Sequence, residues 1–80
     1  MLQRREDLAL FESALERLDM DQRAVFCLFE LEAMSGEDIA QALEIAPGTV
    51  YSRLRSAREA FRKSVRLLTA RQTSHAGGAP

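Results

Sequence analysis

The sequence predicts an all-α fold, a four-helix domain with a C-terminal helix-turn-helix and a long fourth helix. Apolar residues recur at three- and four-residue steps through most of the chain, which is the spacing of one face of an α-helix. No stretch alternates apolar and polar residues in the manner of a half-buried strand, and no segment repeats. Eighty residues with 46% hydrophobic and 29% charged side chains suit one small domain with a modest core.

The first two helices are expected over residues 5–18 and 20–33. Asp19 precedes the second helix as its N-cap, and Gln22, three residues later, completes a capping box. The second helix is apolar over most of its circumference, which predicts a place at the centre of the bundle with Leu28 in the core. The first helix is amphipathic, and its apolar face consists of Leu8, Phe11, Leu15 and Leu18.

The last two helices are expected over residues 36–43 and 47–68. Ser35 is the N-cap of the third helix, whose first turn carries two acids that complement the helix dipole. Pro47 favours the first position of the fourth helix. A continuous apolar stripe then follows at helical spacing: Val50, Leu54, Ala57, Phe61, Val65 and Leu68. The domain is therefore predicted to span residues 5–68, and the small, polar residues 69–80 are predicted to form a disordered tail.

The connection between the third and fourth helices, residues 44–46, is very short. Two helices joined by such a turn cross steeply, which is the geometry of a helix-turn-helix, and Ala40 provides the small side chain needed where they meet. At about 100° per residue, the side of the fourth helix opposite its apolar stripe is mostly hydrogen-bonding or positively charged. This outward side holds Tyr51, Ser52, Arg55, Ser56, Glu59, Arg62 and Lys63.

Charge is divided sharply along the chain. Residues 1–44 carry four arginines and eleven acids, a net charge of −7, whereas residues 45–80 carry six arginines and one lysine against Glu59, a net charge of +6. This division is typical of a localised footprint for a polyanion, with the acidic half facing elsewhere. On charge alone, a solvated basic helix face explains it equally well.

The sequence lacks the residues that several other classes of protein require. Cys27 is the only cysteine, so an internal disulfide or a multi-cysteine metal site is excluded, and His75 has no neighbouring ligands for a metal. No catalytic triad or phosphate loop can be assembled, so we expect neither an enzyme nor a cofactor. No apolar run approaches the roughly 20 residues of a membrane span, and no signal peptide is recognisable, so a cytoplasmic protein is expected.

Residues 31–62 resemble region 4 of bacterial RNA polymerase sigma factors, especially the extracytoplasmic-function group. The distinctive tract is Pro-Gly-Thr-Val-x-Ser-Arg-Leu-x-x-Ala-Arg at residues 47–58, and residues 18–26 resemble the family's approach to its second helix. The likeness extends over about residues 8–68. It implies that the fourth helix is a recognition helix that reads the −35 element of double-stranded promoter DNA.

The resemblance also assigns roles to residues of the fourth helix. Family positions that face bases are matched by Tyr51, Ser52, Arg55 and Ser56. Positions that hold phosphates are matched by Thr49, Arg53 and Arg58. Because a helix N-terminus favours anions, the backbone amides of Gly48 and Thr49 are expected to bind phosphate as well. The outward cations Arg62 and Lys63 are assigned to phosphates too.

Two partners besides DNA follow from the resemblance. The apolar and acidic surface of the first half corresponds to the face that docks on the flap of the polymerase β subunit, or that an anti-sigma factor captures. The alternative from another class is a protein-interaction module without promoter recognition of its own.

Three positions depart from the family pattern. Glu44 stands where the family usually has glycine, so a left-handed backbone there would be strained. Tyr51 stands where lysine or arginine is common, and Ser56 where arginine is frequent. The sequence therefore lacks two basic contacts that relatives make.

Overall fold

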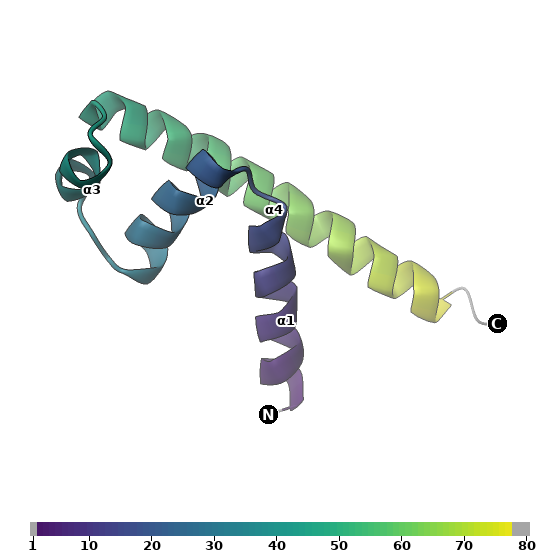
Figure 1. Ribbon diagram of the computed structural model, residues 1–80. Coiled ribbons are helices and arrows are strands. Elements are labelled where there is room, and N and C mark those ends of the chain that lie inside the picture. Colours follow the sequence, from purple (N-terminus) through teal and green to yellow (C-terminus); the bar gives the residue numbers. More distant parts are fainter. Residues whose placement is uncertain (1, 78–80) are drawn as a thin grey trace.

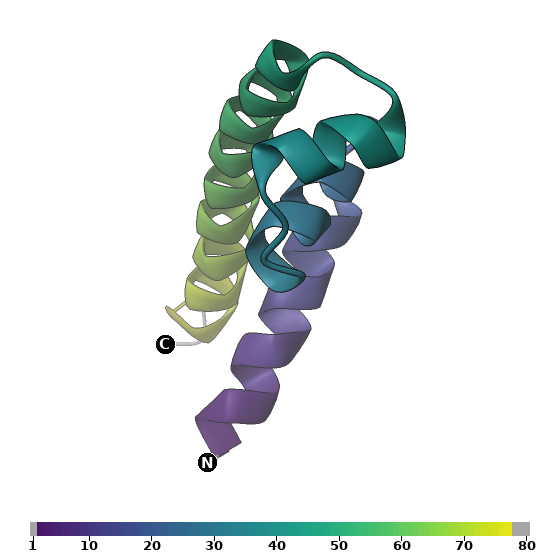
Figure 2. The ribbon, with the colours of Figure 1, turned by 90° about the vertical axis from the view of Figure 1, so that its left-hand side faces the viewer.

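The computed structural model describes the backbone of residues 2–77 and the side chains of residues 5–71. This part of the chain forms α1 (Leu2–Glu16), α2 (Met20–Phe26), the π-helical turn η1 (Cys27–Leu31), α3 (Gly36–Leu43) and α4 (Pro47–Gly77), with no strand among the described residues. The all-α class is confirmed. α3 lies beside the first turns of α4, and α2 and α1 contact α4 further along it (Figures 1 and 2). α1 then diverges from α4, so that the two helices form a V (Figure 1).

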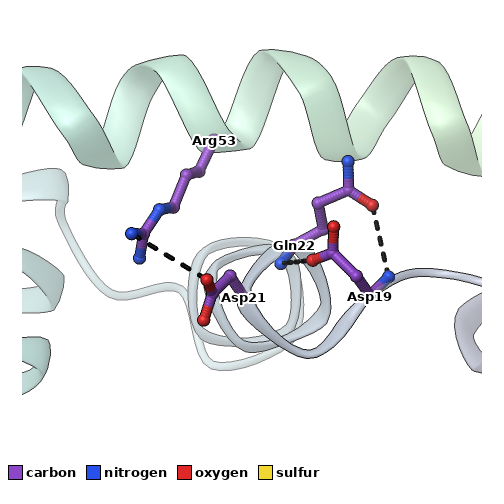
Figure 3. A network of polar contacts seen from close by, with 4 residues as sticks. All are labelled: Asp19, Asp21, Gln22 and Arg53. Carbon is purple, nitrogen blue, oxygen red and sulfur yellow. Dashed lines mark hydrogen bonds and ion pairs between the residues drawn. The ribbon is translucent and has the colours of Figure 1, made fainter.

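The helices begin where their caps predict. The Asp19 side chain accepts a hydrogen bond from the Gln22 N–H at 2.8 Å, and the Gln22 side chain accepts one from the Asp19 N–H at 3.3 Å (Figure 3). Ser35 Oγ accepts a hydrogen bond from the Asp38 N–H at 3.1 Å. Both caps satisfy backbone donors that a helix start leaves unpaired, which confirms the predicted starts of α2 and α3.

The second helix differs from its prediction. It is regular only to Phe26 and continues as the π turn η1, in which the Glu32 N–H donates to the carbonyl of Cys27 at 3.1 Å. The chain then leaves the helix through Ala33, whose φ is 57°, and the Met34 N–H closes the end by donating to the Leu28 carbonyl at 3.0 Å. The helix therefore ends at Leu31, before Ala33. A π turn holds one more residue than an α turn, which an apolar pattern does not reveal.

Two clusters of buried side chains hold the helices together. The first joins α2, α3 and α4 through Val25, Ile39, Ala40, Val50 and Leu54. The second joins the connection between α1 and α2 to α2 and α4 through Leu18, Phe26 and Ala57. The Phe61 ring closes the second cluster, with ring centroids 4.8 Å from Phe26 and 5.3 Å from Phe11. The predicted inward stripe of α4 is buried at Val50, Leu54 and Ala57 and half-buried at Phe61, Val65 and Leu68.

One core prediction needs correction. Leu28 is half-buried and packs against the first cluster from outside, because the π turn follows directly after Phe26. The largest fully buried side chains among the described residues are Val25, Ile39 and Val50.

The turn between α3 and α4 passes through a residue with a left-handed backbone. Glu44 has φ 57° and ψ 48°, and its N–H donates to the Gln41 carbonyl at 3.3 Å. The Ile45 N–H donates to the Ala40 carbonyl at 3.0 Å. The turn therefore keeps a conformation natural to glycine, at a cost of about 1–2 kcal/mol for a residue with a side chain.

The fourth helix is longer than predicted. α4 runs to Gly77, beyond the expected end at Leu68, so the backbone of residues 69–77 continues the helix where a disordered tail was predicted. Ala70, Arg71 and Gln72 are good helix formers, and neither proline nor glycine interrupts the chain before Gly77. Residues 78–80 of the predicted tail lie outside the described residues.

Candidate nucleic-acid interface

The structure places the predicted base-contacting residues on the exposed side of α4. Tyr51, Ser52, Arg55 and Ser56 all lie in the first three turns of the helix and are exposed to solvent. Val50, Leu54 and Ala57, which alternate with them along the helix, are buried and anchor it against α2 and α3. Since this anchoring occupies the inward side, the outward side is presented with a fixed orientation.

The exposed residues divide between two sides of α4. On one side an open hollow, which we call the arginine flank, is lined by Tyr51, Leu54, Arg55, Arg58 and Arg62. Three guanidinium groups there line one concave surface, which favours an anion with several oxygen atoms.

On the other side, a second hollow lies between α4 and the start of α2, and we call it the serine flank. Its lining consists of Ser52, Arg53 and Ser56 from α4 with Asp19, Asp21 and Gln22 from α2. Arg53 reaches toward Asp21 across this hollow, with 3.9 Å between Nη2 and Oδ2 (Figure 3). An ion pair this long and this exposed contributes little to stability. Arg53 is therefore available to another partner.

Arg58 makes a shorter contact with its acidic partner than Arg53 does. Its Nε donates to Oε2 of Glu30 at 2.7 Å, its Nη2 forms an ion pair with the same oxygen at 2.7 Å, and its guanidinium lies 5.3 Å from the centroid of the Phe29 ring. Arg58, which the sequence assigned to a DNA phosphate, therefore has an internal carboxylate partner. Neither Glu30 nor Phe29 was predicted to belong to the site, because they lie 28 and 29 residues away in the sequence.

Tyr51 has a structural contact that the sequence did not predict. A Cβ atom added to Gly36 would lie 2.4 Å from Tyr51 Oη and 2.5 Å from its Cζ, so the ring lies directly against the backbone at the start of α3. Tyr51 nevertheless remains 46% exposed. It thus joins the two helices of the helix-turn-helix while keeping part of its ring accessible.

The N-terminus of α4 differs from prediction in one respect. The Thr49 N–H, which was predicted to bind phosphate, donates to the Ala46 carbonyl at 2.9 Å and so has an internal acceptor. The hydroxyl of Thr49, on a half-buried side chain, is the remaining donor of this residue. Gly48 is exposed, with nothing within 4 Å of the position a Cβ would take. Arg62 and Lys63 are exposed further along α4.

Other kinds of site find no support in the described residues. No group of three or more His, Cys, Asp or Glu side chains in that part of the chain is placed to hold a metal ion. None of the helices searched there is both long enough and apolar enough to span a membrane.

Comparison with known proteins identifies one family. The family described as Sigma-70, region 4 matches residues 8–61, which is more than half of the chain. The match includes α2, α3 and α4 as far as Phe61, and so contains both flanks except Arg62. No curated protein sequence and no solved structure matches.

Proposed function

The chain belongs to the sigma-70 region 4 family, whose role is promoter binding in transcription initiation, and on this basis we propose that α4 reads the −35 promoter element. The observation that supports this most directly is the exposed side of α4, where hydroxyl and guanidinium groups stand on a helix anchored by a helix-turn-helix. Such a helix fits the major groove, where guanidinium forks bind guanine and hydroxyls bind base edges or phosphates.

The proposal divides the residues of α4 by task. Tyr51, Ser52, Arg55 and Ser56 contact bases, since they are exposed in the first three turns. The groups that contact phosphates are the amide of Gly48 and the side chains of Thr49, Arg53, Arg58, Arg62 and Lys63. Asp19 and Asp21 in the serine flank offset the positive charge of Arg53, whereas three arginines line the arginine flank, so the arginine flank faces the nearer DNA backbone.

We place the other partner on the acidic half of the molecule. Three large apolar side chains are strongly exposed there: Leu8 at 57%, Met20 at 82% and Leu31 at 54%. Exposed apolar side chains on an acidic surface suit a protein partner better than DNA. This surface docks on the flap of the RNA polymerase β subunit, or is captured by an anti-sigma factor. The chain acts in the cytoplasm, in a sigma factor of the extracytoplasmic-function group.

A salt titration of binding to duplex DNA tests the proposal. The logarithm of the affinity is expected to fall steeply with the logarithm of salt concentration, because several phosphates are neutralised. The double variant Arg55→Gln/Arg62→Gln should weaken binding and lose sequence preference. Its matched control, Arg66→Gln/Arg71→Gln, removes the same charge from exposed positions further along α4.

Two results would contradict the proposal. Equal losses in both double variants would mean that α4 attracts DNA only by its overall charge. A wild-type protein that binds polymerase or another protein but shows no salt-dependent DNA binding would favour the protein-interaction module.

A further inference from the structure

The contact between Glu30 and Arg58 places a carboxylate where a DNA phosphate is proposed to bind. The Nε–H of Arg58 donates to Oε2 of Glu30 at 2.7 Å, and Nη2 lies 2.7 Å from the same oxygen in an ion pair. Phosphate oxygens accept hydrogen bonds from a guanidinium group in the same way as carboxylate oxygens do. Glu30 and a backbone phosphate therefore compete for the same donors.

We propose that Glu30 is an internal competitor for DNA: it occupies Arg58 in the free protein and releases it when a backbone phosphate arrives. This inference rests on the proposed DNA binding of α4. It makes Glu30, which lies outside the recognition helix, a determinant of DNA affinity.

The exposure of the pair allows the exchange. The Arg58 and Glu30 side chains are 43% and 34% exposed, so water screens the attraction and the pair opens at small cost. A duplex phosphate brings the added gain of released counterions, which an internal carboxylate lacks. The balance therefore favours phosphate once DNA is near.

The surroundings of Arg58 keep it in place during the exchange. The Phe29 ring lies 5.3 Å from the guanidinium and holds it through a cation–π contact that does not involve Glu30. Arg58 also lines the same hollow as Arg55 and Arg62. When Glu30 leaves, Arg58 thus remains beside two further cations that favour the phosphate.

Affinity measurements on charge-matched variants test the competition. Glu30→Gln should bind duplex DNA about two- to fivefold more tightly, the factor that an exposed ion pair supplies. The control is Glu32→Gln, which removes the same charge from an exposed acid two residues along, with no ion pair to any described residue. In an Arg58→Ala background, Glu30→Gln should give no more gain than Glu32→Gln, because the contested donors are absent.

The nuclear magnetic resonance signal of the Arg58 Nε–H group reports the exchange directly in the wild-type protein. Adding duplex DNA should shift this signal as the acceptor changes from carboxylate to phosphate, while helix content by circular dichroism stays constant. An Nε–H signal unmoved by saturating DNA, or equal affinities of Glu30→Gln and Glu32→Gln, would refute the competition while leaving DNA binding by α4 intact. If no protein in the series binds DNA, the proposed function fails, and the competition fails with it.

Discussion

Replacing Gly36 with alanine tests the packing at the centre of the helix-turn-helix. The new Cβ would lie 2.4 Å from Tyr51 Oη, about 1 Å inside ordinary contact, so the Tyr51 ring must move away from α3. Overpacking of this kind costs about 1–3 kcal/mol. The higher helix propensity of alanine raises the free energy of unfolding by about 1 kcal/mol. The net expectation is a loss of stability of up to about 2 kcal/mol.

The same substitution should behave differently once the ring is removed. In a Tyr51→Ala background nothing opposes the new Cβ, so Gly36→Ala should stabilise the protein slightly. The difference between the two backgrounds, about 1–3 kcal/mol, measures the coupling of Gly36 to Tyr51. Urea unfolding of the four proteins, followed by circular dichroism at helical wavelengths, provides the free energies.

Gly48, whose Cβ position has open space around it, is the control for this substitution. Gly48 lies in the first turn of α4, as Gly36 lies in that of α3, but no atom lies within 4 Å of its Cβ position. Gly48→Ala should therefore be neutral or slightly stabilising with or without Tyr51. Equal effects of Gly36→Ala in both backgrounds would show that the ring does not lie against α3, and the reasoning would be refuted.

Three further predictions concern the core, the turn and the DNA surface. Ile39→Ala should lower the free energy of unfolding, measured in urea, by about 2–5 kcal/mol, because Ile39 is fully buried. Leu28→Ala should lower it clearly less, because Leu28 is only half-buried, and equal losses would contradict this difference in burial. Glu44→Gly should raise the unfolding free energy by up to about 1 kcal/mol by relieving the left-handed backbone, and a loss would contradict this. Arg55→Ala should lose about 1–3 kcal/mol of binding free energy on the preferred promoter and reduce discrimination at one base position. Arg58→Ala should weaken binding to all sequences alike and lower the slope of log affinity against log salt concentration by about one. Affinities for single-base promoter variants at two salt concentrations measure both effects.

The features that could be predicted from the sequence are local ones. Asp19, Ser35 and Pro47 act within one turn of their own position, so the starts of three helices were correctly predicted. The buried stripe of α4 was also correct, because a helix of this length repeats its apolar face several times. Four helices and a short third connection were then enough to predict the helix-turn-helix.

The features that could not be predicted depend on tertiary contacts or on backbone details. Glu30 meets Arg58 across 28 residues, and no spacing rule relates them. Tyr51 was assigned to bases because it matches a base-facing family position on the outward side. Its ring also reaches Gly36, a contact that only the crossing of α3 and α4 determines. The extension of α4 past Leu68 was missed because the apolar stripe ends there, although the backbone preference for helix continues.

The placement of charge gives the molecule an electric dipole. Seven of its eleven basic residues stand on α4, whereas eleven of its twelve acids precede that helix. In the field of a polyanion, this dipole turns α4 toward the nucleic acid before any contact forms, and so raises the rate of productive encounters. The Debye length is only about 8 Å at physiological ionic strength, whereas the molecule extends over 53 Å. The dipole therefore orients the molecule only when it is already close to the nucleic acid. Orientation by charge thus speeds association most at low salt, even though the net charge of the whole chain is −1.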